Sequence, residues 1–126
     1  MDSSIYPNST VIGRFGESLA EQALTNAGYN VIDHNWRGSV GEIDLVAIQN
    51  DYLIFVEVKV RKSLKFGSPE ESITRSKQRR INHTALEYLF KTAQQEKPWR
   101  VDIVAIELSS TNKVVRLSHY IGVDVG

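Results

Sequence analysis

Two apolar stretches decide the fold of this chain, Glu42-Ile-Asp-Leu-Val-Ala-Ile48 and Leu53-Ile-Phe-Val-Glu-Val-Lys-Val60. Both are rich in β-branched residues, and the turn signal Gln49-Asn-Asp51 between them predicts a hairpin of two buried strands. Three charged side chains, Asp44, Glu57 and Lys59, nevertheless lie inside these strands. A charge in a buried strand costs several kcal/mol unless it is paired or binds a metal ion. The sequence therefore predicts a functional site on this hairpin.

The register of the hairpin decides which of these charges meet. Side chains alternate between the two faces of a strand, so Glu57 and Lys59 share one face. If the loop spans residues 49–52, Asp44 lies opposite Glu57, with Cβ atoms about 4.5–5.5 Å apart. In the same register, Glu42 lies opposite Lys59. A slip of one residue would put Asp44 and Glu57 on opposite faces, so the site depends on this register.

Facing carboxylates are a candidate metal site, because they repel each other unless a cation lies between them. Mg²⁺ prefers oxygen ligands, so we expect Asp44, Glu57 and the main-chain carbonyl of Val58 to bind it, with Mn²⁺ able to substitute. Lys59 would orient the attacking water or neutralise charge that develops on a phosphate. The competing interpretation is structural: a charged edge strand in which Glu42 pairs with Lys59 and Asp44 pairs with another lysine.

Length and composition indicate one globular domain. The chain has 126 residues, of which 41% are hydrophobic and 24% are charged, and these values are ordinary for a domain with a single core. The sequence contains no long apolar run that would predict a membrane span, no visible secretory signal and no cysteine. We expect a flexible N-terminus over residues 1–10, a single domain over 11–126, a cytoplasmic location and no membrane partner.

Charge is distributed unevenly along a chain whose net charge is zero. Residues 1–58 carry two basic and eight acidic side chains, whereas residues 59–80 carry eight basic and two acidic ones. A basic segment directly after an acidic hairpin is expected where a polyanion approaches a bound cation. Six of the basic residues are candidate nucleic-acid contacts: Arg61, Lys62, Lys65, Arg75, Lys77 and Arg79. The alternative interpretation is a solvated loop and helix face.

Periodicity predicts the order αβββαββ, an α/β or α+β domain with a central mixed sheet flanked by helices. We expect a first helix at about 11–27. A second helix should begin at Ser68 or Thr74, the two candidate caps, and end at about residue 95. The expected strands are 29–36, 42–48, 52–61, 100–108 and 114–121, with a basic loop at 62–72. The histidines have no ligand-like spacing, and the pattern leaves open whether Asp102 points inward or to solvent.

The pattern Asp44…Glu57-Val-Lys59 resembles the PD-(D/E)xK signature of nucleases with the restriction-endonuclease-like fold. Over residues 11–108 the chain is similar to the uncharacterised bacterial YraN-like family of that superfamily, and to archaeal Holliday-junction resolvases. The supporting segments are Gly13-Arg-Phe-Gly-Glu-Ser-Leu-Ala20, Gly28-Tyr, Asn35-Trp-Arg37, Gly41-Glu-Ile-Asp-Leu45, Phe55-Val-Glu-Val-Lys59, Phe66-Gly67 and Arg100-Val-Asp-Ile-Val-Ala105.

The resemblance implies a metal-dependent endonuclease that hydrolyses phosphodiester bonds of DNA, with branched or junction DNA as a candidate substrate. It implies Asp44, Glu57 and Lys59 as the catalytic set, with Glu17 and Gln78 as accessory catalytic residues on the two helices. The resolvase likeness also implies a homodimer, since symmetric cutting of a junction needs two sites.

Some positions depart from the family pattern or allow a second interpretation. Ile43 replaces the Pro that precedes the Asp in the classical signature, and Asn82 replaces a Tyr found in some relatives. Glu17 is equally well explained as a solvated helix residue. Gln78 would orient a metal-bound water or the lysine, or would only satisfy a loop carbonyl.

The sequence leaves other function classes open beside the nuclease. The main alternative is a nuclease-fold module that binds nucleic acid with little or no catalytic turnover. A purely structural partner protein is a third class, for which neither Mg²⁺ binding nor salt-dependent DNA binding is expected. The residues do not distinguish DNA from RNA.

Overall fold

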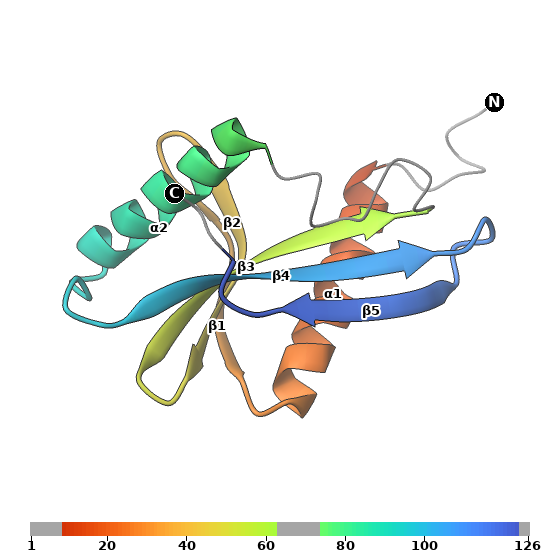
Figure 1. Ribbon diagram of the computed structural model, residues 1–126, viewed down its shortest axis with the longest axis horizontal. Coiled ribbons are helices and arrows are strands. Elements are labelled where there is room, and N and C mark those ends of the chain that lie inside the picture. Colours follow the sequence, from red (N-terminus) through yellow and green to blue (C-terminus); the bar gives the residue numbers. More distant parts are fainter. Residues whose placement is uncertain (1–8, 63–73, 124–126) are drawn as a thin grey trace.

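The computed structural model of the protein describes residues 9–62 and 74–123. These residues form a five-stranded mixed sheet with one helix packed on each face (Figure 1). The elements in chain order are α1 (Ser9–Asn26), β1 (Asn30–Arg37), β2 (Glu42–Gln49), β3 (Tyr52–Arg61), α2 (Arg75–Lys91), β4 (Trp99–Leu108) and β5 (Val114–Tyr120). Within the described residues this is the order expected from the sequence. No helix in the described part of the chain is both long and apolar enough to cross a membrane.

The strands lie in the sheet in the order of the chain, β1-β2-β3-β4-β5. Neighbouring strands are antiparallel except β3 and β4, which are parallel. A parallel pair needs a crossover connection, and α2 provides it. The central strand β3 therefore presents one face to α1 and the other to α2.

The register of the β2–β3 hairpin is the expected one. Ile48 pairs with Leu53, and a two-residue turn begins at Asn50, whose φ of 55° is in the left-handed region that asparagine tolerates. Because the register holds, Glu57 is on the same face of β3 as Phe55, which packs against α2. Alternation along β2 breaks at Asp44, because Ile43 packs in the half of the core under α2 and Leu45 packs in the half under α1.

The core has two halves, one on each face of the sheet. The half under α1 contains Ala20 and Leu24 together with residues of β2, β3 and β4. Gly16, not Phe15, continues the buried stripe of this helix, and the Phe15 side chain is 43% exposed. The half under α2 is built around Phe55, which makes edge-to-face ring contacts with Tyr88 and Trp99.

Two expected boundaries change, and the choice between the two candidate caps is settled. Helix α1 begins at Ser9, so residues 9 and 10 are helical and not part of a flexible N-terminus; residues 1–8 of that segment lie outside the described residues. Thr74 is the N-cap of α2 because its Oγ1 accepts the N–H of Lys77, at 3.2 Å. Ser68 and most of the basic loop lie outside the described residues. Helix α2 ends at Lys91, not near residue 95, and Ala93 beyond it has a φ of 55°.

Candidate functional site

Strands β2 and β3 separate at Asp44. The last backbone pair between them is Leu45 with Val56, although β3 continues to Arg61. One step further, the main-chain N–H of Val58 donates to Oδ2 of Asp44 at 2.7 Å. The carboxylate thus takes the place of a missing backbone acceptor, which fixes Asp44 at the point where the two strands diverge.

Asp44 is surrounded by other carboxylates. Burial, followed by repulsion from Glu57, raises the pKa of Asp44 from 3.8 to about 7. Glu17 and Glu42 raise it further, and the hydrogen bond from Val58 opposes them. Four acidic side chains from α1, β2 and β3 are therefore close enough to interact in a partly buried site. Such crowding of negative charge is unfavourable without a cation.

Lys59 neutralises part of this charge. Its Nζ lies 3.5 Å from Oε1 of Glu57, and the two side chains are only 11% and 19% exposed. Burial nevertheless raises the pKa of Glu57, while Lys59 and then Lys77 act to lower it. The expected cross-strand pair of Glu42 with Lys59 is wrong: Glu42 pairs instead with Arg37 on β1, at 3.4 Å. The separation of β2 from β3 beyond Leu45 explains the difference, because the ladder that would bring Glu42 to Lys59 is not formed.

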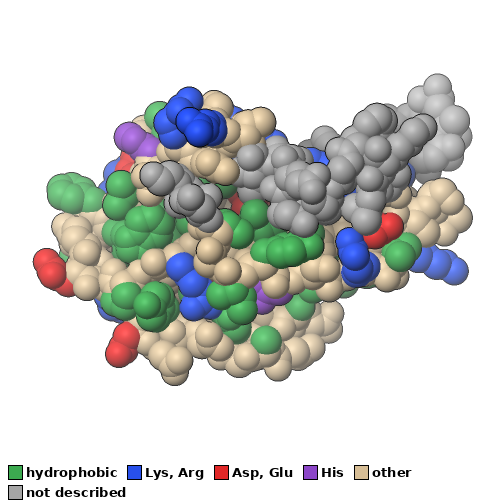
Figure 2. All heavy atoms as spheres, viewed as in Figure 1, with side chains coloured by type: hydrophobic (Ala, Val, Ile, Leu, Met, Phe, Trp, Pro, Cys, Tyr) green, Lys and Arg blue, Asp and Glu red, His purple; other side chains and the backbone are tan. Residues whose placement is uncertain are grey.

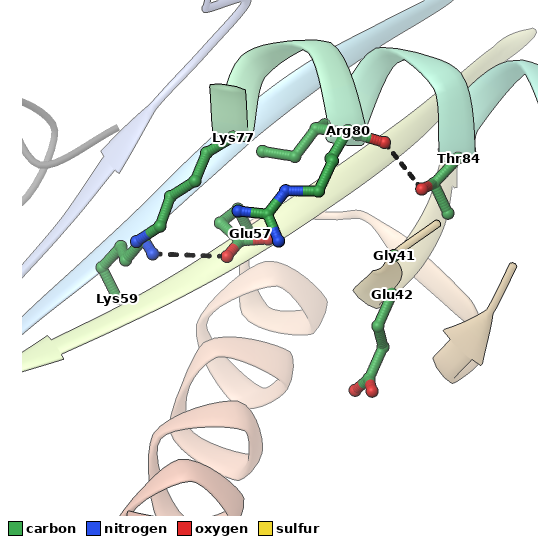
Figure 3. Close-up of a pocket in the computed structure, with 8 residues that line it drawn as sticks. Gly41, Glu42, Glu57, Lys59, Lys77, Arg80 and Thr84 are labelled. Carbon is green, nitrogen blue, oxygen red and sulfur yellow. Dashed lines mark hydrogen bonds and ion pairs between the residues drawn. The ribbon is translucent and has the colours of Figure 1, made fainter. Parts of the chain in front are cut away.

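The site opens into a pocket between the sheet and α2, with a volume of about 170 Å³. Its lining residues are Gly41, Glu42, Glu57, Lys59, Lys77, Arg80, Ile81 and Thr84. Figure 3 shows Lys77 and Arg80 extending from α2 toward Glu57 and Lys59 on β3, with Glu42 lying apart on β2. The pocket therefore has acidic groups on the sheet and basic groups on both the sheet and the helix.

The turn between β1 and β2 closes one end of the pocket against α2. The N–H and hydroxyl of Ser39 both donate to Oε1 of Glu87, at 2.9 and 3.1 Å. Gly41 approaches the helix so closely that an added Cβ would lie 3.0 Å from Oγ1 of Thr84. Since Glu42 follows Gly41 directly, these contacts also help to fix where β2 begins.

Helix α1 brings Glu17 to the site through a close helix–strand contact. An added Cβ at Gly16 would overlap Cγ2 of Val60, so only glycine allows α1 to pack this tightly on β3. The next residue, Glu17, is half-buried and is one of the groups that raise the pKa of Asp44. Glu17 is therefore not a wholly solvated residue of the helix.

The predicted basic residues do not all reach the pocket. Lys77 lines it, whereas Arg75 and Arg79 are exposed on α2. Figure 2 shows Lys and Arg side chains gathered at the surface over the start of this helix. Arg61 and Lys62 lie at and just beyond the end of β3, and Lys65 lies outside the described residues.

Three polar residues of α2 differ in their relation to the pocket. Gln78 is half-buried but does not line the pocket. Arg80, which was not among the candidate contacts, lines it, and Arg79 does not. Helical spacing is the signal that separates the two arginines: Arg80 is one turn before Thr84, and Arg79 falls on the opposite side of the helix from the buried residues.

The donor set fits a hard divalent cation in its chemistry. Within residues 9–62 and 74–123, no group of three or more His, Cys, Asp and Glu side chains is arranged to hold a metal ion. The remaining possibility is two carboxylates, Asp44 and Glu57, completed by a main-chain oxygen and water. In a strand, a residue's N–H and C=O point to the same edge, so the Val58 carbonyl is on the Asp44 side of β3. The raised pKa means that the ionised form of Asp44 is disfavoured in this site, and a bound cation would stabilise that form.

A second buried charged cluster lies on the α1 face of the sheet, away from the pocket. Asp102, 0% exposed, accepts Nε of Arg100 at 3.0 Å, Nε2 of His119 at 2.8 Å and the N–H of Gly122 at 2.9 Å. Arg100 also donates to the hydroxyl of Tyr29 at 2.9 Å. Every polar group in the cluster is paired, so it joins β4, β5 and the end of α1 as a structural element.

Comparison with known proteins places the whole core in one family. Residues 16–106 match the uncharacterised protein family UPF0102. The chain is 46% identical over 99 residues to a UPF0102 protein of Rhodococcus opacus (strain B4), covering 79% of this chain and 84% of the relative. It is 40% identical over 108 residues to a UPF0102 protein of Alkaliphilus oremlandii (strain OhILAs), covering 86% and 92%. The UPF0102 protein of Caldicellulosiruptor bescii is 39% identical over 112 residues, covering 88% and 94%. The chain therefore belongs to the uncharacterised protein family UPF0102, to which the expected YraN-like resemblance corresponds.

Proposed function

We propose that this protein is a metal-dependent endonuclease of the restriction-endonuclease-like class, which hydrolyses phosphodiester bonds in DNA. One observation carries the proposal: Asp44 and Glu57, both partly buried, repel each other where β2 and β3 separate, and Nζ of Lys59 lies 3.5 Å from Oε1 of Glu57. The repulsion between the two carboxylates destabilises the fold, and no described contact explains why both are present. A metal-dependent site requires such a pair.

Each residue has a role in the proposed reaction. Asp44, Glu57 and the Val58 carbonyl hold Mg²⁺, or Mn²⁺ in its place. The bound ion would polarise a phosphate oxygen and lower the pKa of a water molecule. Lys59 is held in place by Glu57, so its ammonium is positioned to neutralise charge on the phosphate. Glu17, whose charge acts on Asp44, would accept a hydrogen bond from the attacking water.

The basic residues supply the attraction for the substrate. Lys77 lines the pocket and Arg61, at the end of β3, is near enough to act on it. Lys62 follows Arg61 in the chain, and Arg75 is the first residue of α2. Phosphate contacts of this kind orient a nucleic acid without reading its sequence. We therefore expect recognition of DNA structure. If four-way junctions are the substrate, two sites are needed and the protein acts as a homodimer.

A binding module with little turnover is the second candidate. The ion pair between Lys59 and Glu57 favours it, because Lys59 already compensates one of the two carboxylates without a metal ion. In this case the basic surface binds DNA, and Asp44 and Glu57 are retained only as part of the structure.

Cleavage of a labelled panel in Mg²⁺ and in Mn²⁺ separates the two candidates. The panel contains a four-way junction, a flap, a single strand, a linear duplex and a supercoiled plasmid, with an RNA strand alongside. Wild type is compared with Asp44→Ala and Lys59→Ala purified in the same way, so that a contaminating nuclease would cut in all three. Cutting by the wild type alone establishes the enzyme and names its substrate. No cutting, with binding that weakens as salt rises, supports the binding module.

A further inference from the structure

Two cations on α2 face the pocket without a salt bridge to any residue that the structure describes. Lys77 and Arg80 both line the pocket, and Lys59, its third cation, is paired with Glu57. Glu57 also attracts Lys77, whereas Lys59 and Arg61 repel it. The pocket lining therefore holds three cations against two carboxylates, Glu42 and Glu57, and this excess of positive charge favours an anion.

The charge of the helix N-terminus points to the same ligand. The first turn of α2 contains Arg75 and Lys77 and no acidic residue. The N-terminal end of a helix carries partial positive charge, so acidic residues there stabilise the helix and basic residues do not. The basic first turn is therefore unfavourable for the helix alone, but both effects attract a negatively charged group to the same end of the pocket.

The two cations are on the pocket side of α2, and Arg79 is not. Lys77 lies one turn before Ile81, and Arg80 lies one turn before Thr84. Both Ile81 and Thr84 are buried against the sheet and line the pocket. Arg79 does not line the pocket and is exposed. This neighbouring pair of arginines provides a control, since each can be removed with the same loss of charge from the same helix.

Resting on the proposed function, we propose that Lys77 and Arg80 form a phosphate-binding subsite that holds one phosphate of the nucleic-acid strand beside Asp44 and Glu57. The volume of about 170 Å³ is the space of roughly five water molecules, which suits one phosphate with part of its sugar and not a base pair. Arginine can present two parallel N–H donors to phosphate oxygens, and the lysine adds a point charge.

DNA binding without metal tests the subsite independently of catalysis. The affinity of a fluorescein-labelled DNA strand is measured by anisotropy in EDTA at constant ionic strength, for wild type, Lys77→Ala, Arg80→Ala and Arg79→Ala. We expect Lys77→Ala and Arg80→Ala each to weaken binding about tenfold, the loss of one charge-assisted hydrogen bond. Arg79→Ala should weaken it less than about twofold, because only general attraction is lost. All three side chains extend from an exposed or partly exposed helix face, so the variants should fold, and matching melting temperatures verify this.

Inorganic phosphate distinguishes a small ligand from a strand. It should compete with the labelled strand for wild type and for Arg79→Ala, and this competition should be lost in Arg80→Ala. Equal weakening by all three substitutions would overturn the subsite in favour of general electrostatics. Phosphate binding that is lost in Arg80→Ala, with no binding of DNA, would overturn the strand as the ligand and leave a free phosphate site. If the expected pattern is found but the labelled panel is not cut, the endonuclease proposal fails and the subsite remains.

Discussion

The carboxylate of Asp44 accepts the main-chain N–H of Val58 at 2.7 Å, and this contact gives one side chain two conflicting roles. The carboxylate gives a main-chain N–H of β3 a hydrogen-bond acceptor where β2 no longer pairs with that strand. It also adds a negative charge near Glu57. The first role stabilises the fold and the second destabilises it. A site of this kind is expected to trade stability for function.

Asp44→Asn should stabilise the metal-free protein at alkaline pH. The amide oxygen can still accept the Val58 N–H, but the charge is absent. Because the pKa of Asp44 in the folded protein is raised to about 7 from 3.8, the folded state binds the proton more tightly than the unfolded state. Wild type therefore loses stability as pH rises from about 4 through 7, and the loss is complete above 7. We expect Asn to gain about 2–4 kcal/mol at pH 8 and almost nothing at pH 4.

Urea unfolding in EDTA at the two pH values measures this difference. Asp51→Asn is the matched control, because Asp51 is an exposed carboxylate in the turn of the same hairpin. Saturating Mg²⁺ should stabilise wild type and not Asp44→Asn, since only the wild type retains both carboxylates. A gain that is the same at both pH values would contradict the role of the Asp44 charge.

Lys59→Gln should separate metal binding from catalysis. Removing the ammonium frees Glu57 from its ion pair, so the titration heat of Mg²⁺ should be retained or increased, while cleavage is lost. Glu57→Gln should lose both. Without metal, Lys59→Gln should cost about 2–4 kcal/mol of stability, because a largely buried carboxylate is left unpaired. Calorimetry with the two variants decides the point: loss of the Mg²⁺ heat in Lys59→Gln would show that the lysine is part of the binding site.

Strand alternation alone was enough to predict the central hairpin. The pairing of Ile48 with Leu53 follows from a short turn between two apolar runs, and it brings Asp44 beside Val58 on β3. The point at which the strands separate was not predictable. It depends on the β1–β2 turn, which Ser39 anchors to Glu87 on α2, and this contact spans 48 positions in sequence.

Two features of the helices could not be predicted from apolar residues alone: which residue of α1 packs on β3, and which face of α2 lies on the sheet. A count of apolar residues favours Phe15 for the buried face of α1, but close packing against Val60 requires Gly16 there. On α2, the sequence shows four basic residues in the first two turns without showing which face the sheet. Thr84 fixes that direction, because it is fully buried and donates to the carbonyl of Arg80 at 2.6 Å. A buried threonine is not an apolar signal, so the pattern did not identify Arg80.

Gly16→Ala should destabilise the protein, although alanine is the better helix former. The new methyl would overlap Cγ2 of Val60, a β-branched side chain with little freedom to move. We expect a cost of about 1–3 kcal/mol, the usual range for an overpacked core. Gly13→Ala in the same helix is the control, since nothing lies within 4 Å of its added Cβ. It should be neutral or stabilising by up to about 1 kcal/mol. Urea unfolding compares them, and equal effects would mean that α1 does not pack on β3 as described.

Asp102→Asn should be among the most destabilising single substitutions on the α1 face. Burial alone would raise the pKa of Asp102, but hydrogen bonds from His119, the Gly122 N–H and Arg100 outweigh it and hold the pKa below its ordinary value. The lowered pKa adds stability at pH values above the ordinary Asp range, and this stability is lost as pH falls through the folded-state value. Because the substitution leaves Arg100 without its buried anion, we expect a loss of about 3–5 kcal/mol at pH 7.

The pH dependence of unfolding tests this account of Asp102. The difference between wild type and Asp102→Asn should be constant from pH 6 to 8 and should shrink below about pH 4, where the unfolded wild type takes up its proton. Glu107→Gln on the same strand is the control: its carboxylate lies 3.9 Å from Arg116 in a pair that is partly exposed to solvent, and we expect the pair to contribute about 1 kcal/mol or less. A difference for Asp102→Asn that stays constant down to pH 2 would show that lost packing, and not the buried charge, accounts for the cost. The cluster would then hold β4 to β5 by shape alone.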